Sequence, residues 1–448
     1  SCLIRSQIIC VSFAAMRRFF FLVAALVVAE PVTEHEILLY EVDVEVAPSE
    51  RYARVLADLL QRRGPEAFIE TYEGWNFWLS KAMPELFGNR SLAEATQSKW
   101  LATLNISHPK VVAELVTIAS SLRAVDGTDN PILELPALAT VVSLYPILNT
   151  AAKNSTDTKP SACTSILARQ ADGKVLHGRS LDYEPRDPMA KATVAIDFHR
   201  QGRRLYRCLH PMQYPSALQW FTCVRPGAFS LSVNARSQGV ETEHNASFDE
   251  LLRRMSAPGV ELLGELAERA MTAESYEDAL AELISRPVVS SNYFILAGAQ
   301  GQGAVVTRFG NESSADVWAL GSSSHVSDGQ PPWLRVQTNV DHWVSFASGA
   351  YATHRRQHAL DLFEGIGQHS LDKDSFLDVY FTTTARAGSE QRRAPEDTGV
   401  ILRPTTIASL VMDPNTSLGD KPDLKYWHVW AETPSIQPAV TSAATVQV

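Results

Sequence analysis

The sequence predicts an α+β fold that begins with a helical segment. Residues 30–162 carry apolar side chains at helical intervals, most clearly over residues 49–62 and 111–122. After residue 163 the pattern changes to short runs of β-forming residues, then to helices, and then to strands again. This order of elements suits a two-sheet sandwich covered by helices.

The strand-rich part opens with a predicted hairpin. Residues 164–168 and 174–181 flank Asp172-Gly173, a dipeptide that favours a tight turn between strands. The further expected strands are 193–199, 204–210, 228–234, 288–297, 304–309, 316–320, 334–338, 399–403 and 424–429. The expected helices of this part are 248–255, 260–271, 276–284 and 353–363. Strands therefore enclose a helical block in the middle of this part.

Length and composition limit the functions open to the chain. Its 448 residues suffice for one large or two medium domains with a substantial core. Hydrophobic residues make up 45% of the chain and charged residues 20%, as in an ordinary globular protein. The formal net charge of −10 argues against a nucleic-acid partner, because phosphate binding needs a basic surface.

Residues 1–29 are predicted to be a secretory signal peptide with an upstream extension. Met16-Arg-Arg precedes an apolar run of about eleven residues that ends at Ala29, too short to span a membrane. Residues 1–15 would then precede the initiator methionine. Glycosylation sequons occur at Asn89, Asn105, Asn154, Asn245, Asn311 and Asn415. Together these features favour the secretory pathway, with a lysosomal or extracellular destination.

Three cysteines follow the predicted signal peptide. Cys208 and Cys223 lie on adjacent strand-like segments, where they could pair or be buried as small apolar residues. Cys163 is then left as the candidate nucleophile. The cysteine spacing fits no zinc site and the twelve histidines form no ligand cluster, so we expect no metal and no cofactor.

Cys163 needs a base before it can attack a carbonyl, because the thiolate is the nucleophile. No nearby histidine suits a Cys-His pair, and His177 has at most one neighbour in reach. Cleavage between Ala162 and Cys163 would create an α-amino group, which titrates at roughly 7.7–8.0 and can serve as the base. The polar, turn-rich residues 151–160 form an accessible linker directly before this bond.

Three motifs in order carry a family resemblance: Cys163-Thr-Ser-Ile, His177-Gly-Arg-Ser-Leu-Asp-Tyr183 and Val336-Gln-Thr-Asn-Val-Asp-His-Trp343. Over residues 35–430 the chain resembles the acid ceramidase and N-acylethanolamine-hydrolysing acid amidase family. These N-terminal-nucleophile cysteine hydrolases are made as precursors that cleave themselves before the cysteine. The resemblance implies an α/β/β/α sandwich, with 30–162 as a helical α subunit or pro-segment and 163–448 as the catalytic β subunit.

The resemblance also implies roles for single residues. Cys163 would be the nucleophile, and Arg179 would lower its pKa and orient it. Asp182 would hold the α-amine, and Asn339 would present its amide to the oxyanion, a donor worth about 2.7–4 kcal/mol in another hydrolase. Arg355 would match the functional arginine of the family's arginine pair. The neighbouring residues Asp341, His342 and Trp343 would support or pack behind the site.

Local geometry raises a question about Arg179 and Asp182. Residues three apart lie on opposite faces of an unbroken strand, so both reach one thiol only if the strand ends or bends, and Gly178 would permit a bend. The chain departs from the family in having Ala235 where an acidic residue is expected, so self-cleavage could be slow, relocated or supported by Asn234. It also has no cysteine in 30–162 to link two subunits.

The favoured interpretation is a lumenal amidase that cleaves N-acyl lipids such as ceramides or N-acylethanolamines. Its partners would be the lipid amide, a transient membrane or vesicle surface, and the two chains of the cut precursor. Trp75, Trp78 and the apolar run 143–148 are candidate acyl-chain or membrane contacts, with core packing the alternative for the tryptophans. Two alternatives stay open: a hydrolase of bile salts or penicillin-type amides, and a non-catalytic lipid-binding paralogue, motivated by Ala235.

Overall fold

A computed structural model provides the fold. It describes residues 37–127, 129–149, 162–215, 222–236, 247–310, 314–322, 329–345, 351–382 and 401–430. The predicted signal peptide, the linker 151–160, and the sequons at Asn154, Asn245 and Asn311 lie outside the described residues.

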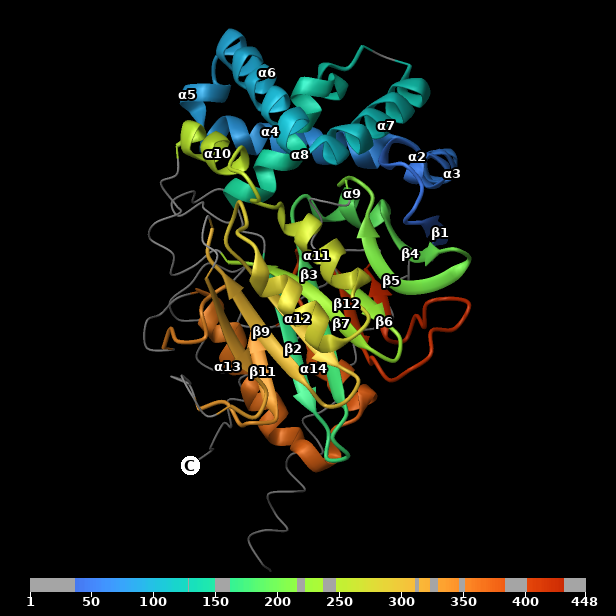
Figure 1. The fold of residues 1–448 in the computed structure, drawn as a ribbon, viewed down its shortest axis with the longest axis vertical. Coiled ribbons are helices and arrows are strands. Elements are labelled where there is room, and N and C mark those ends of the chain that lie inside the picture. The colour runs from blue at the N-terminus through green and yellow to red at the C-terminus, as the bar shows by residue number, and fades with distance from the viewer. Residues whose placement is uncertain are drawn as a thin grey trace, which may run out of the picture. The chain divides into compact units, whose positions relative to one another are not determined.

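Two β-sheets form the centre of the described fold (Figure 1). The first, in spatial order, is β1 (Leu39–Asp43), β4 (Thr193–Arg200), β5 (Arg203–Pro211), β6 (Thr222–Arg225), β7 (Phe229–Ala235), β8 (Asn292–Gly298), β9 (Gly303–Arg308) and β10 (Ala315–Ala319). The second is β11 (Leu334–Gln337), β2 (Ala162–Arg169), β3 (Val175–Asp182), β12 (Thr406–Met412) and β13 (Trp427–Val429). The sheets face each other, since Ser165 on β2 and Ser232 on β7 share a hydrogen bond of 2.9 Å.

Helices cover the outer faces of both sheets. On the second sheet, α13 (Tyr351–Ile366) and α14 (Lys373–Phe381) bury an apolar cluster that includes Phe363 and Phe376. On the first sheet, α12 (Tyr276–Ser285) packs on β8 and β9, and α11 (Leu263–Thr272) packs beside α12 (Figure 1). The predicted α/β/β/α sandwich is therefore confirmed.

A helical segment precedes the sandwich, as predicted. Its helices are α2 (Pro48–Arg51), α3 (Ala53–Arg63), α4 (Glu66–Ala82), α5 (Pro84–Phe87), α6 (Arg90–Ser107), α7 (Pro109–Asp126) and α8 (Leu135–Asn149), with a 3-10 turn at Pro131–Leu133. The remaining short helices are α9 (Arg186–Lys191), α10 (Phe248–Met255) and a 3-10 turn at Gln368–Ser370. The segment is not wholly helical, because β1 pairs in parallel with β4 at the edge of the first sheet.

Trp75 and Trp78 belong to the core in this uncut chain. Trp75 is fully buried and donates from Nε1 to the backbone oxygen of Glu184 at 2.8 Å, and Trp78 is 7% exposed. Core packing of the tryptophans is thus confirmed, and neither indole forms a membrane-facing surface. In the run 143–148, Ser143 and Leu144 are also buried, and the side chains of 145–148 lie outside the described ones.

Several expected elements were wrong or missed. No strand covers the described part of 399–403, which forms bends, and the strand is β12, seven buried residues that follow Pro404. A proline lacks the N–H that a central strand must donate, so the strand begins beyond it. The short strand β1 and the helix α14 were also missed, whereas β6 contains Cys223, which was expected on a strand-like segment.

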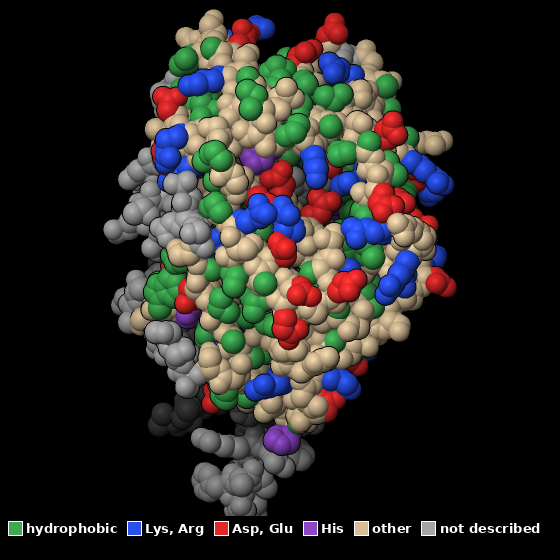
Figure 2. All heavy atoms as spheres, viewed as in Figure 1, with side chains coloured by type: hydrophobic (Ala, Val, Ile, Leu, Met, Phe, Trp, Pro, Cys, Tyr) green, Lys and Arg blue, Asp and Glu red, His purple; other side chains and the backbone are tan. Residues whose placement is uncertain are grey.

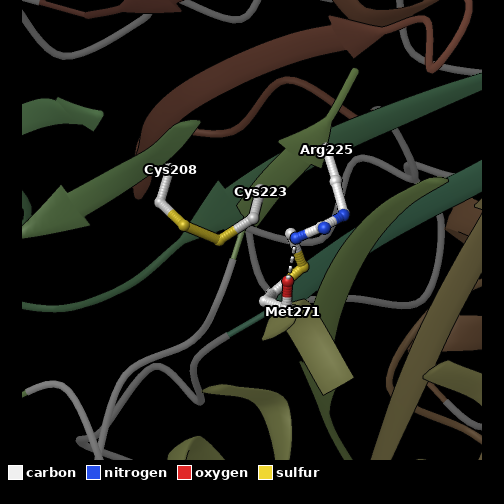
Figure 3. Close-up of a disulfide and its surroundings, with 4 residues drawn as sticks. All are labelled: Cys208, Cys223, Arg225 and Met271. Carbon is white, nitrogen blue, oxygen red and sulfur yellow. Dashed lines mark hydrogen bonds between the residues drawn. A yellow bond between two sulfur atoms is a disulfide. The ribbon is translucent and has the colours of Figure 1, made fainter. Parts of the chain in front are cut away.

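Cys208 and Cys223 form a disulfide, which settles the question of their pairing (Figure 3). They lie directly opposite each other on β5 and β6, and both are buried. Close by, Arg225 donates from Nη1 to the backbone oxygen of Met271 at 3.2 Å, which joins β6 to the end of α11. Among the described residues, Cys163 is the cysteine with a free thiol.

Two surface properties bear on partners. On the face drawn in Figure 2, acidic and basic side chains intermingle instead of forming a patch of one sign. In the described part of the chain, no helix combines the length and apolar character needed to cross a membrane.

Candidate active site

The β2–β3 hairpin positions the candidate nucleophile. Gly173 takes the positive φ of 92° that the turn needs, and the two strands then pair without a break from Arg169 to Ala162. In this register Cys163 lies opposite Leu181, and Ala162 lies opposite Asp182. Since side chains alternate along a strand, Cys163 and Arg179 share the face that packs on the first sheet.

The thiol of Cys163 lies beside a buried cation. Arg179 donates from Nη2 to Sγ at 3.1 Å, and its Nη1 donates to Asn234 Oδ1 and to Ser165 Oγ. Burial raises the pKa of the Cys163 thiol, and the charge of Arg179 lowers it. Arg179 is therefore placed to stabilise the thiolate, and Asn234 and Ser165 hold Arg179 in that position.

The backbone of Cys163 is held by Asn339 and Arg355. The Cys163 N–H donates to Asn339 Oδ1 at 2.8 Å, and Arg355 Nη1 donates to the Cys163 carbonyl at 3.1 Å. Arg355 Nη2 also donates to Asn339 Oδ1 at 2.7 Å. The Asn339 amide donates from Nδ2 to the backbone oxygen of Ala235 at 2.8 Å, so in this arrangement its donor is engaged. The oxyanion role of Asn339 stays a prediction.

Asp182 lies on the other face of β3, next to the bond that precedes Cys163. Its Oδ1 accepts hydrogen bonds from Ser180 Oγ at 2.8 Å and Thr406 Oγ1 at 2.7 Å. Its Oδ2 is buried without a hydrogen-bond partner among the described residues and lies 3.9 Å from Arg355 Nη1. Burial raises the pKa of Asp182, and the charges of Arg403 and Arg355 oppose that rise.

The bend expected at Gly178 is absent. β3 runs unbroken from Val175 to Asp182, and Arg179 and Asp182 occupy opposite faces as alternation requires. Both residues lie beside Cys163: Arg179 donates a hydrogen bond to its sulfur, and Asp182 lies opposite Ala162, the residue that precedes it. Gly178 instead lets α14 pack closely on the sheet, since a Cβ at this position would lie 2.2 Å from Cε1 of Phe376.

The other motif residues surround the site. Arg356 donates to the Asp341 carbonyl at 3.0 Å and to the backbone oxygen of Val344, so it orders the loop while Arg355 enters the site. Asp341 accepts from Arg236 at 2.7 and 2.9 Å. The His342 ring stacks on Trp318 with centroids 4.3 Å apart, which fits the expected packing role.

His177 is not a base for Cys163. Its ring nitrogens lie 2.9 Å from Ser230 Oγ and 2.8 Å from Ser232 Oγ, two partners where the sequence suggested at most one. Burial lowers its pKa to about 3, so the ring is neutral.

Ala235 ends β7, and its methyl group is 1% exposed. Strand alternation turns it away from the face on which Asn234 meets Arg179. Its contribution to the site is the carbonyl that binds Asn339. The effect of the missing carboxylate on cleavage stays a prediction.

Chain similarity supports the resemblance suggested by the motifs. No family model matches. The chain is 28% identical over 224 residues to the N-acylethanolamine-hydrolyzing acid amidase of Caenorhabditis elegans, covering 50% of this chain and 58% of that protein. It is 30% identical over 195 residues to the acid ceramidase of Pan troglodytes, covering 40% and 46%. These similarities support the acid ceramidase and N-acylethanolamine-hydrolysing acid amidase family as the one that this chain resembles.

The chain spans about half the length of the curated family members it matches. A solved structure of the Caenorhabditis elegans N-acylethanolamine-hydrolyzing acid amidase ortholog aligns with 62% of this chain and all of that one, at 25% identity and a TM-score of 0.43.

Two hydrogen-bond partners of Asp182 are not predicted by the sequence motifs. Thr406 is 224 positions away in the chain, and no motif marks it. Ser180 lies inside the second motif, but nothing in its position distinguishes it from a surface serine. The described sequons at Asn89, Asn105 and Asn415 are exposed, and their glycosylation stays a prediction. No three His, Cys, Asp or Glu side chains gather as a metal site within the described ranges.

Proposed function

We propose that this chain is a lumenal cysteine amidase of the N-terminal-nucleophile type that hydrolyses the amide bond of N-acyl lipids. One observation carries the proposal: the Cys163 thiol lies beside Arg179 while the nitrogen of the same residue is bound by Asn339, opposite Asp182. A nucleophile whose own amine is the base needs both its sulfur and its nitrogen in position.

Activation is a cut between Ala162 and Cys163. The Cys163 sulfur attacks the Ala162 carbonyl, the C–N bond breaks, and a thioester and a free α-amine result. Water then hydrolyses the thioester, giving the Ala162 carboxylate and restoring the thiol. The new amine carries hydrogens that the peptide nitrogen lacked. Asp182 Oδ2 accepts no hydrogen bond from the described residues, which supports its role as their acceptor.

Substrate hydrolysis repeats this chemistry on an external amide. The amine takes the thiol proton, the sulfur attacks the acyl carbon, and the amine delivers the proton to the leaving nitrogen. Water releases the fatty acid from the thioester. The relatives named for N-acylethanolamine and ceramide hydrolysis support N-acyl lipids as the substrate class, and the signal-like N-terminus supports a lysosomal or secreted location.

Non-covalent contacts hold the cut chains together in this proposal. β1 pairs with β4, and Arg51 donates from Nη1 to Glu268 Oε1 at 3.0 Å, so both kinds of contact join the helical segment to the sandwich. No disulfide joins these two parts within the described residues.

Mass spectrometry of the purified chain at mildly acidic pH tests the cut directly. For the wild type we expect the masses of two polypeptides, one that ends at Ala162 and one that begins at Cys163. For Cys163→Ala we expect the mass of one uncut chain. A Cys163→Ala variant that still matures at this bond would contradict self-cleavage.

A panel of an N-acylethanolamine, a ceramide and glycine-conjugated cholate tests the activity. We expect hydrolysis of an N-acyl lipid; release of glycine alone would favour the bile-salt alternative. An uncut chain that binds lipid and resists a thiol-reactive probe would favour the non-catalytic paralogue.

A further inference from the structure

A chain of hydrogen bonds runs from the β12 strand to Asp182. The Arg403 N–H donates to Thr406 Oγ1 at 2.8 Å, and the Thr406 N–H donates back to the Arg403 carbonyl at 2.9 Å. A hydroxyl has one proton to donate. Because Oγ1 already accepts from Arg403, that proton is directed to Asp182 Oδ1, 2.7 Å away.

A β-bulge places Thr406 in this position. On β12, Ala408 pairs with Leu181 on β3, and the next pair is Thr406 with Asp182. Ile407 is the extra residue, and in a regular ladder it would lie opposite Asp182 instead. Bulges next to active sites re-aim side chains in this way. The bulge thus replaces an apolar neighbour of the carboxylate with a hydroxyl donor.

The two oxygens of the Asp182 carboxylate differ in the hydrogen bonds that they accept. Oδ1 accepts two hydroxyl protons, from Ser180 and Thr406, and both donors are fully buried. Oδ2 accepts none from the described residues, although a buried charged oxygen without a partner is costly. The two hydroxyls therefore fix the carboxylate through Oδ1, and Oδ2, which lies 3.9 Å from Arg355 Nη1, can still accept a hydrogen bond.

We propose that Thr406 is a positioning residue, which holds Asp182 so that Oδ2 faces the α-amine created by cleavage before Cys163. This inference rests on the proposed function. Thr406 acts through Asp182 and touches neither the thiol nor a substrate. Its loss leaves the carboxylate free to rotate and removes a donor that stabilises the charged form.

Thr406→Val tests the proposal, because valine keeps the shape of threonine and lacks its hydroxyl. We expect kcat/KM per cut molecule at mildly acidic pH to fall about ten- to hundredfold, the range that a hydrogen bond to a charged group covers. We also expect the acid limb of the pH profile to move up by about one unit, because the pKa of Asp182 rises. Thr406→Ser should restore both to within about threefold.

Thr405→Val is the matched control. Thr405 is the adjacent buried threonine, and its Oγ1 has no hydrogen-bond partner among the described residues, so this variant should keep the wild-type rate and profile. Ser180→Ala removes the second donor to Oδ1 and should move the acid limb in the same direction. Ser180→Ala replaces Thr406→Val as the test if Thr406→Val does not fold.

The outcomes separate the two proposals. A wild-type profile for Thr406→Val, or equal losses for Thr406→Val and Thr405→Val, would overturn the role of Thr406. If the wild type cleaves itself but hydrolyses no amide, the proposed function is wrong. The pH dependence of Cys163 α-amine acetylation then decides on Thr406: an amine pKa lowered in Thr406→Val supports its role, and an unchanged one overturns it. A wild type that never cleaves overturns both.

Discussion

Arg179 Nη2 lies 3.1 Å from Cys163 Sγ, and both side chains are buried. Two effects therefore oppose each other at the thiol. Loss of water disfavours the thiolate and raises its pKa, while the adjacent cation lowers it. The reactivity of Cys163 therefore depends on how far the charge of Arg179 offsets the effect of burial on the thiol pKa.

Replacing Arg179 by Gln should leave burial as the dominant effect. We expect the pKa of Cys163 to rise by at least about one unit, which lowers the thiolate fraction at neutral pH about tenfold. The measurement is the rate of iodoacetamide labelling of Cys163 across pH, followed by mass spectrometry. Arg62→Gln, at an exposed ion pair on α3, is the control. Equal labelling midpoints for the two variants would refute the role of Arg179.

The adjacent arginines on α13 should differ in function. Arg355 donates hydrogen bonds to Cys163 and Asn339, whereas Arg356 donates to the backbone oxygens of Asp341 and Val344. We expect Arg355→Lys to lower amide hydrolysis at least about a hundredfold, because donors at a reacting centre have effects of that size.

Arg356→Lys is the comparison, and it should keep activity within about tenfold. Both variants lose buried hydrogen bonds, so thermal unfolding should show similar losses of stability. Activity losses that merely follow the loss of stability in both variants would contradict a special role for Arg355.

The sequence predicted several of the residues that the structure brings together around Cys163, but not all of their contacts. The Asp172-Gly173 turn and the fixed spacing of Arg179 and Asp182 from Cys163 are local, so the sequence predicts them. The contact between Thr406 and Asp182 was not predictable, because a bulge in β12 creates it and that strand was not predicted from the sequence. The two residues are also 224 positions apart in the chain.

The alternation of side chains along β3 was also predictable. The bend was expected because both Arg179 and Asp182 were assumed to contact the thiol of Cys163. The sulfur and the backbone of Cys163 offer two separate points of contact. The family resemblance selected Arg355 from the Arg355–Arg356 pair, and Arg355 is the arginine that contacts Cys163 and Asn339 in the structure.

Gly178→Ala should destabilise the fold, because the added Cβ meets rigid rings. It would lie 2.2 Å from Cε1 of Phe376 and 2.5 Å from Cε2 of Tyr380. We expect a loss of about 1–3 kcal/mol in the free energy of unfolding, measured with urea. Gly365→Ala is the control: nothing lies within 4 Å on α13, and alanine should stabilise a helix by about 0.5–1 kcal/mol. Equal unfolding midpoints for the two variants would show that α14 can move away.

Buried histidines should make the free energy of unfolding depend on pH in the acidic range. Burial lowers the pKa of His177 and of His210 from 6.5 to about 3. Between these values the unfolded chain binds protons that the folded chain excludes, so stability falls as pH drops from 6.5 towards 3. Each histidine contributes about 1.4 kcal/mol per pH unit over this window.

His177→Gln removes one of these titrations while keeping groups that can hydrogen-bond Ser230 and Ser232. Urea unfolding at pH 7, 6, 5 and 4 should show a pH slope reduced by about one proton, and the same should hold for His210→Gln, with twice the effect in the double variant. At pH 7 either variant should be less stable than the wild type, since each loses native contacts. An unchanged slope would mean that the folded chain binds protons at these histidines as readily as the unfolded chain does, which would contradict the prediction. His177 and His210 would then cause no loss of stability in an acidic lumen, where the protein is proposed to work.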